Sequence, residues 1–196
     1  MSETSSFERT PIITIAGKPG SGKSTTSKAV AAELGFQHFS SGDLFRAISK
    51  EQGLDLLSGN AHAEKDAAID HAVDQRLRDI GATESDIVID SRMAWHWMPQ
   101  SFKVYLNLDM KIAAQRIIAN TDPERLVHEH IPSDPVDYAQ QLTLRFESEA
   151  RRYESLYGVN PYDLENYDLV VDTAENNAEQ SIALVIDAYR RWISEK

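Results

Sequence analysis

Residues 12–25 read IITIAGKPGSGKST and carry the strongest structural signal in the chain. The run from Ile12 to Ala16 is mostly β-branched and ends at a glycine, which predicts a short buried strand. The residues from Ser24 to Leu34 predict a helix with Gly35 as its stop. Between the strand and the helix lies a glycine-rich loop that matches the pattern G-x-x-x-x-G-K-[ST].

That loop has the chemistry of a phosphate site. Glycines let the backbone turn back so that successive N–H groups point into one cavity, and the following helix adds the positive end of its dipole. Lys23 is placed to reach the β- and γ-phosphates, and the Ser24 hydroxyl is placed to bind Mg²⁺. Because the pattern follows a strand and opens a helix, we predict nucleotide binding at Gly17, Lys18, Pro19, Gly20, Ser21, Gly22, Lys23, Ser24 and Thr25.

The rest of the chain alternates apolar runs with helical periods. Four further strands are expected, near residues 36–40, 87–90, 104–108 and 169–171. Helices are expected over residues 43–52, 64–80, 110–119, 135–158 and 178–193, the first two ended by Gly53 and Gly81. The proline-containing segment 122–137 is expected to be irregular. This alternation predicts an α/β fold, the three-layer arrangement of the P-loop NTPases, with a five-stranded parallel sheet between two layers of helices.

Composition narrows the class of protein. The chain has 196 residues, which fits one domain at about 100–200 residues per domain. It has no cysteine, which excludes disulfides and thiolate metal sites, and its net charge of −11 argues against general nucleic-acid binding. No stretch approaches the ~20 apolar residues of a membrane span, and the N-terminal residues lack the apolar core of a secretory signal. We expect a soluble, cytoplasmic monomer with neither nucleic acid nor a membrane as its partner.

A GTPase switch is disfavoured by two missing patterns. Such a switch needs an aspartate three residues before a glycine, and none of the nine glycines has one. The pattern N-K-x-D is also absent from the sequence.

A second anion site is predicted where the second strand meets its helix. Residues 39–46 read FSSGDLFR: small residues, a glycine, and then a helix with an arginine one turn in. Arg46 can hold a phosphate bidentately, and Ser41 and Asp43 can hydrogen-bond a substrate. Helix capping is the alternative role for Ser41 and Asp43, and a solvated position is the alternative for Arg46.

Two further charged residues follow the third strand. Asp90 ends that strand and Arg92 comes two residues later, at the sheet edge where ligands bind in open parallel sheets. Asp90 can orient Mg²⁺ through water while Arg92 reaches an acceptor phosphate. The alternative is a strand-end cap beside a surface arginine. For Trp95 and Trp97 core packing is favoured over stacking on a pyrimidine.

The helices in the second half of the chain carry more arginines. Arg116 lies on the helix after the fourth strand, and its alternative role is a solvated partner of Asp109 or Asp122. Arg145, Glu149 and Arg152 share one polar face of the long helix, with salt bridges to Glu147 or Glu149 as the alternative role of the arginines. Arg151 is expected in solvent. We expect this polar face to lie opposite the apolar face of Leu142, Phe146 and Tyr153.

The sequence resembles the nucleoside monophosphate kinases, and most closely the archaeal-type cytidylate (CMP) kinases. The resemblance covers about residues 11–190 and rests on ITIAGKPGSGKST, SSGDLFR, VIDSRMAW, RFESEARRYESLYG and YDLVVDT. It implies one kinase domain over residues 1–196. The core is expected at about 11–40, 83–115 and 159–196, a monophosphate-binding arm at about 41–82, and a lid with its helix at about 116–158.

The predicted activity is transfer of the γ-phosphoryl group of ATP to a nucleoside monophosphate, with CMP or dCMP as the first choice. Catalysis is expected to rest on positioning and charge neutralisation. Catalytic roles are predicted for Lys23, Arg116, Arg145 and Arg152, substrate contacts for Ser41, Asp43, Arg46, Asp90 and Arg92, and Mg²⁺ ligation for Ser24 and Asp90. The turn at 172–176 is expected to line the adenine. Two alternatives remain: another small-molecule P-loop kinase such as an adenylate kinase, and a regulatory module that binds ATP and has no acceptor.

Overall fold

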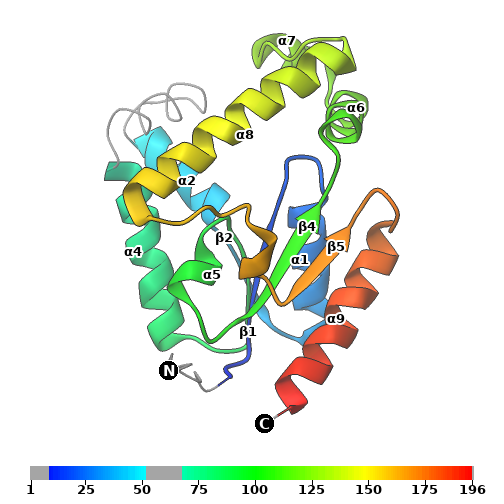
Figure 1. Cartoon of the computed structure of the whole chain (residues 1–196). Coiled ribbons are helices and arrows are strands. Elements are labelled where there is room, and N and C mark those ends of the chain that lie inside the picture. The colour runs from blue at the N-terminus through cyan, green and yellow to red at the C-terminus, as the bar shows by residue number, and fades with distance from the viewer. Residues whose placement is uncertain (1–8, 52–67, 196) are drawn as a thin grey trace.

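A single parallel sheet organises the chain, as Figure 1 shows. The computed structural model describes residues 9–51 and 68–195. Within them the sheet has the strand order β2-β3-β1-β4-β5, with every neighbouring pair parallel. The strands are β1 (Ile12–Gly17), β2 (Gln37–Ser40), β3 (Ile87–Asp90), β4 (Phe102–Asn107) and β5 (Leu169–Asp172). The predicted α/β class and five-stranded parallel sheet are confirmed.

Helices cover both faces of this sheet (Figure 1). The helices of the described residues are α1 (Lys23–Leu34), α2 (Ser41–Glu51), α4 (Ala68–Thr83), α5 (Ala94–Trp97), α6 (Met110–Asn120), α7 (Pro123–His128), α8 (Pro135–Tyr157) and α9 (Ala178–Ser194), with a 3-10 turn η1 (Leu164–Asn166). α1 and α9 pack on one face, and α4 and α5 pack on the other.

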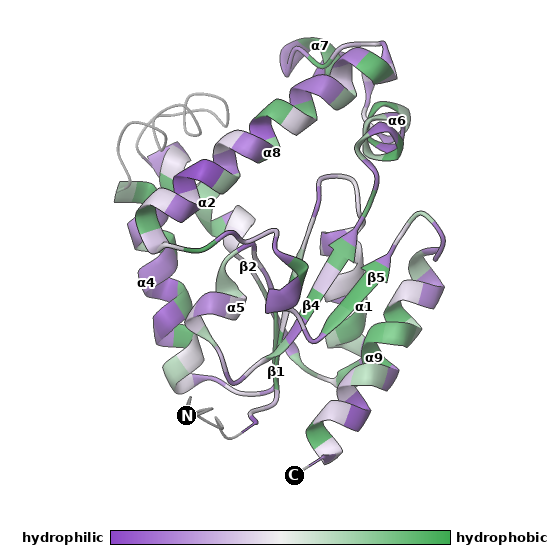
Figure 2. Cartoon of the chain, viewed as in Figure 1, coloured by the Kyte–Doolittle hydropathy of each residue, from purple (hydrophilic) through white to green (hydrophobic). Residues whose placement is uncertain are grey.

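The alternation of side chains along the strands builds two hydrophobic cores. In β1, Ile13 and Ile15 join the core that α1 and α9 complete, whereas Ile12 joins the core of α4 and α5. All three isoleucines are at most 1% exposed, as expected for a parallel strand covered on both faces. Figure 2 shows β5 in the hydrophobic colour, while α8 carries hydrophilic residues along much of its length.

A third, smaller core joins α8 to α6. Ala113 and Ala114 of α6 pack against Ala139 and Leu142 of α8, and Leu108 lies beneath them. Figure 1 shows α8 running from this contact across the carboxyl edge of the sheet to the neighbourhood of α2 and α4. The long helix therefore connects two regions that lie on different sides of the phosphate loop.

Three expectations about the helices need correction. Gly81 does not end α4, which continues to Thr83; a Cβ at Gly81 would lie 2.7 Å from Cγ of Met98, so the glycine allows close packing. The segment 122–137 is not irregular throughout, because Pro123 and Pro135 occupy first-turn positions of α7 and α8, where proline needs no N–H donor. The short helix α5 was not expected.

Other boundaries agree with prediction within one or two residues. The positions of Gly53 and of residues 64–67 lie outside the described residues. None of the helices in the described part of the chain is long and apolar enough to cross a membrane.

Candidate functional site: three pockets along the carboxyl edge of the sheet

The parallel strands bring the predicted site residues to one edge. β1 ends at Gly17, β2 at Ser40 and β3 at Asp90, and the register pairs Ser40 with Asp90 and Ile15 with Asp90. The phosphate loop, the start of α2 and the segment after β3 therefore meet in space.

The glycine-rich loop needs its glycines for backbone geometry. Gly20 and Gly22 have φ values of 70° and 80°, in the left-handed region that disfavours side chains. A Cβ at Gly20 would also lie 3.1 Å from the carbonyl oxygen of Ala113 in α6. The loop, residues 17–25, lines a pocket of about 290 Å³ together with Arg92 and Arg145. Since α1 begins at this pocket with no acidic residue in its first turn, its N-terminus favours an anion there.

Asp90 lies directly under the loop. Its carboxylate accepts hydrogen bonds from Nζ of Lys23 at 2.5 Å and from Oγ of Ser24 at 2.7 Å, and the residue is only 3% exposed. The structure thus brings together the three residues predicted to act on the phosphates and the metal. Asp90 is not among the residues that line the pocket on the α2 side.

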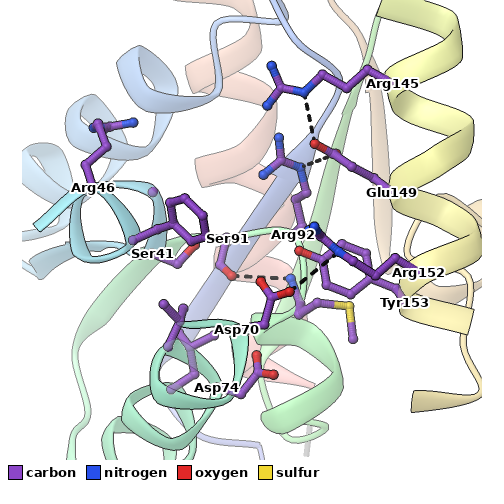
Figure 3. A pocket seen from close by; sticks show the side chains of 15 residues that line it. Ser41, Arg46, Asp70, Asp74, Ser91, Arg92, Arg145, Glu149, Arg152 and Tyr153 are labelled. Carbon is purple, nitrogen blue, oxygen red and sulfur yellow. Dashed lines mark hydrogen bonds and ion pairs between the residues drawn. The ribbon is translucent and has the colours of Figure 1, made fainter. Parts of the chain in front are cut away.

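A second pocket, of about 160 Å³, lies between α2, α4, α8 and the segment after β3 (Figure 3). Its polar lining residues are Ser41, Arg46, Asp70, Asp74, Ser91, Arg92, Arg145, Glu149 and Arg152, and its apolar ones include Phe45, Val73, Leu77 and Met93. We call this the α2–α4–α8 pocket. Its mixture of cations, carboxylates and an apolar slot suits a small molecule that carries both a phosphate and a ring.

Two of the three residues predicted to contact a substrate at the start of α2 line this pocket. Ser41 and Arg46 line it, and the Ser41 hydroxyl donates to the carbonyl of Asp90 at 3.2 Å. Asp43 does not line the pocket; it pairs with Arg46, and both side chains are more than half exposed. The N–H of Asp43 donates to the Ser40 hydroxyl, so the side chain that caps the helix start belongs to Ser40.

Two arginines belong to both the loop pocket and the α2–α4–α8 pocket. Arg92 and Arg145 line each of them. Glu149 pairs with both, through Nε of Arg92 at 3.0 Å and Nε of Arg145 at 3.1 Å. The polar face predicted on α8 is therefore directed at the site, and Glu149 is part of it.

Arg152 pairs with a carboxylate from a different helix. Its Nε lies 3.5 Å from Oδ2 of Asp70 on α4, and both side chains are largely buried. Burial raises the pKa of Asp70, with Arg152 opposing the shift and Asp74 adding to it. Arg151 extends into solvent at 71% exposure, as predicted, and pairs with Glu147.

The polar face of α8, with Arg145 and Arg152, adjoins its apolar face instead of lying opposite to it. Tyr153 lines the same pocket as Arg145 and Arg152. A rotation of about 100° per residue sets Tyr153 about 100° from Arg152 and about 80° from Arg145 around the helix axis, so the expectation of opposite faces is wrong.

A third pocket, of about 650 Å³, lies on the other side of the loop. Gly20, Gly22 and Thr25 line it together with Arg116 of α6 and with Thr173 and Asn176, which follow β5. Arg116 donates to the carbonyl of Thr173 at 2.7 Å, and the alternative role, an ion pair with Asp109 or Asp122, is not seen among the described residues. We call this the β5–α6 pocket.

The tryptophans have structural positions. Trp95 donates to the carbonyl of Arg92, and Trp97 donates to Asp74, both from Nε1. Neither lines the α2–α4–α8 pocket, so packing, the favoured expectation, describes their surroundings.

Asp70 and Asp74 were missed by the sequence interpretation. They lie at i and i+4 on the same side of α4 as Val73 and Leu77, and both are at most 6% exposed. Two aspartates interleaved with the apolar positions of an amphipathic helix are the signal that could have identified them.

Comparison with known proteins gives consistent matches. Residues 16–137 match a family described as an AAA domain. A cytidylate kinase from Halobacterium salinarum is 35% identical over 188 residues, which cover 94% of this chain and 92% of that protein. A cytidylate kinase from Sulfurisphaera tokodaii is 34% identical over 188 residues, covering 94% and 98%. A shikimate kinase structure from Bacteroides thetaiotaomicron, 14% identical, has the same fold, with a TM-score of 0.61 over 91% of this chain and 98% of that one.

Proposed function

We propose that this chain, which belongs to the cytidylate kinase family and matches an AAA domain over residues 16–137, transfers the γ-phosphoryl group of ATP to CMP. The observation that carries the proposal is the sharing of Arg92 and Arg145 between the phosphate loop and the α2–α4–α8 pocket. Two guanidinium groups at the junction of two pockets suit a reaction in which a phosphoryl group passes from one to the other.

The donor side of the site is the loop together with the β5–α6 pocket. The backbone N–H groups of the loop and Lys23 hold the phosphates of ATP. The β5–α6 pocket adjoins the loop and has the size for the adenine and ribose, with Thr173 and Asn176 on its rim. Arg116, which lines this pocket, acts on the donor side.

Ser24 and Asp90 suit a magnesium ion. Their side chains offer a hydroxyl and a carboxylate oxygen 2.7 Å apart at the foot of the loop. Mg²⁺ prefers such hard oxygen ligands and is commonly held by one or two carboxylates, waters and substrate phosphates. When bound, the ion would neutralise the phosphate charge that builds up during transfer. Ser24 would bind the ion and Asp90 would orient it through water, while Asp90 also holds Lys23 in place through their ion pair.

The acceptor side is the α2–α4–α8 pocket. Arg46 and Arg92 hold the phosphate of CMP, and the Ser41 hydroxyl lies at the same end. Phe45, Val73 and Leu77 supply an apolar slot for the ring.

Asp70 and Asp74 supply a means to distinguish cytosine from uracil. The exocyclic amino group of cytosine donates hydrogen bonds, which a carboxylate accepts, whereas uracil presents a carbonyl oxygen that a carboxylate repels. Oδ2 of Asp70 forms no hydrogen bond in the described structure, and its ion-pair partner, Nε of Arg152, lies 3.5 Å away, so this oxygen can still accept from the ligand. We assign the reading of the base to these two aspartates.

Transfer itself requires the two substrates to be held in line. Arg92 and Arg145 neutralise the charge of the phosphoryl group in transfer, and Lys23 contacts that group from the donor side. Arg152 of α8 lines the acceptor pocket. The lid at about residues 116–158 closes over the substrates and excludes water, which limits hydrolysis of ATP. The arm at about 41–82 supplies part of the acceptor pocket, and residues 52–67 of it lie outside the described residues. The chain acts as a monomer.

The test is an ADP-release assay with ATP and CMP, dCMP, UMP, AMP or no acceptor. We expect CMP to give the highest kcat/KM. Preference for AMP would identify an adenylate kinase, and release of ADP at the same rate without any acceptor would identify an ATP-hydrolysing module.

A further inference from the structure

Glu149 is a buried carboxylate that three side chains surround. Only 13% of its side chain is exposed. Its Oε1 accepts from Nε of Arg145 at 3.1 Å, and its Oε2 lies 3.0 Å from Nε of Arg92 and accepts from the Tyr162 hydroxyl at 2.8 Å. Each carboxylate oxygen therefore has a defined partner on a different segment of the chain.

The nitrogen through which each arginine meets Glu149 decides which way its guanidinium group points. In both pairs the nitrogen closest to Glu149 is Nε, so each guanidinium group keeps its two terminal nitrogens for another ligand. Figure 3 shows the forked ends of Arg92 and Arg145 pointing away from Glu149, toward the side of the pocket where α2 carries Arg46. A guanidinium held through Nε presents that fork in a fixed direction, as bidentate binding of a phosphate requires.

Charge explains why a carboxylate is needed at this point. Arg92 and Arg145 line the same two pockets, and two guanidinium groups so close together repel each other. Burial alone would raise the pKa of Glu149, but Arg92 and Arg145, with hydrogen bonds from Tyr162 and Arg145, lower it below the ordinary value. Glu149 is therefore ionised, and it offsets one of the two positive charges while the other remains for the substrate.

Glu149 is itself fixed from a third direction. Tyr162 stacks on Phe146 of α8 with ring centroids 3.6 Å apart, and its hydroxyl reaches Glu149 on the same helix. The carboxylate thus has little freedom to turn, and it transmits this restriction to both arginines.

We infer that Glu149 is a positioning residue, which holds Arg92 and Arg145 through their Nε atoms so that both forks face the phosphoryl group in transfer. The inference rests on the proposed function, since it assigns Glu149 a part in that reaction. A positioning role has a different consequence from that of a salt bridge that only stabilises the fold. Loss of Glu149 should impair the chemical step more than the binding of either substrate.

The test begins with Glu149→Gln. An amide has one accepting oxygen and one donating nitrogen, so it can accept from one arginine but must face the other with a donor. We expect kcat at saturating ATP and CMP to fall about 10- to 100-fold, the scale on which misplacement by about 1 Å slows a reaction. KM for ATP should change less than threefold. The matched control is Glu147→Gln, an exposed glutamate on the same helix that pairs with Arg151 and should leave kcat unchanged.

A double-mutant cycle separates positioning from a general effect on folding. If Glu149 acts through the arginines, Glu149→Gln should reduce kcat several-fold less in an Arg145→Ala background than in the wild type. If Glu149→Gln reduced kcat by the same factor in the wild type and in the Arg145→Ala background, the inference would be overturned.

Tyr162→Phe provides a second variant that leaves the charge of Glu149 untouched. It keeps the ring that stacks on Phe146 and removes only the hydroxyl, so kcat should fall about fivefold, as for one ordinary hydrogen bond. If Glu149→Gln does not fold, as judged by circular dichroism, an unchanged kcat in Tyr162→Phe would still overturn the inference. A wild-type protein that phosphorylates no monophosphate would instead contradict the proposed function, so the two failures are distinguishable.

Discussion

Lys23 and Asp90 form a direct ion pair, with 2.5 Å between Nζ of the lysine and Oδ1 of the aspartate. The aspartate is almost fully buried, and the lysine side chain keeps 24% of its surface exposed to the loop pocket. Asp90 therefore gives the cation of the phosphate loop a fixed partner within the protein. The pair links the first strand–loop–helix unit to the end of β3, so that the loop has a defined position relative to the rest of the edge.

Lys23→Ala should nearly abolish phosphoryl transfer. Loss of a key charge in this chemistry costs about 10³-fold or more in kcat. Because Asp90 is buried and would keep only the hydrogen bond from Ser24, we also expect a lower thermal unfolding midpoint without loss of the fold. The ADP-release assay and circular dichroism measure the two effects. Retention of a tenth of wild-type turnover would contradict the role of Lys23.

Arg46→Ala should affect the acceptor and spare the donor. Arg46 lines the α2–α4–α8 pocket but not the loop pocket, and its side chain is 55% exposed. We expect KM for CMP to rise about tenfold, the lower end for a hydrogen bond to a charged group, with KM for ATP within twofold. Lys50, an exposed cation one turn further along α2, lines none of the three pockets described here and provides the control as Lys50→Ala. Equal weakening of both substrates would assign Arg46 to a different role.

Arg152→Ala should be far more damaging than Arg151→Ala. Arg152 is buried against Asp70 in the α2–α4–α8 pocket, whereas Arg151 is in solvent. Removal of the Arg152 side chain leaves the buried carboxylate of Asp70 without its partner. We therefore expect kcat/KM for CMP to fall by about 100-fold or more while KM for ATP changes little. Steady-state kinetics of the two variants with CMP varied make the comparison. If Arg151→Ala lost activity and Arg152→Ala kept it, the assignment of Arg152 to the face of α8 that lines the pocket would be wrong.

The use of CMP should depend on pH through Asp70. Burial raises the pKa of Asp70, so this carboxyl takes up a proton at a higher pH than an exposed aspartate does. The ionised form accepts from the cytosine amino group; as pH falls through the raised pKa, kcat/KM for CMP should therefore fall. Asp70→Asn should remove this acidic limb and raise the ratio of UMP to CMP turnover, because an amide N–H can donate to uracil. An acidic limb that is identical in Asp70→Asn would belong to another group, such as the substrate phosphate.

The sequence predicted the elements and the loop better than the contacts between distant residues. The loop and its flanking strand and helix are local in sequence, and the parallel sheet then requires Asp90 and Arg92 to reach the same edge. The pairing of Arg152 with Asp70 could not be predicted in this way, because it depends on how α8 crosses α4. The same holds for Glu149, whose i+4 relation to Arg145 is visible in the sequence but whose contact with Arg92 is tertiary.

The length of α8 has a consequence for how the two substrates bind. Its 23 residues form a rod of about 35 Å, at about 1.5 Å per residue. One end packs on α6, which carries Arg116 at the β5–α6 pocket, and the other end supplies one wall of the α2–α4–α8 pocket. A continuous helix can shift as a unit, so a displacement that nucleotide binding causes at α6 also moves the wall that CMP contacts. ATP and CMP should therefore change each other's dissociation constants by the same factor, a reciprocity that calorimetric titrations in both orders would measure with a non-hydrolysable ATP analogue.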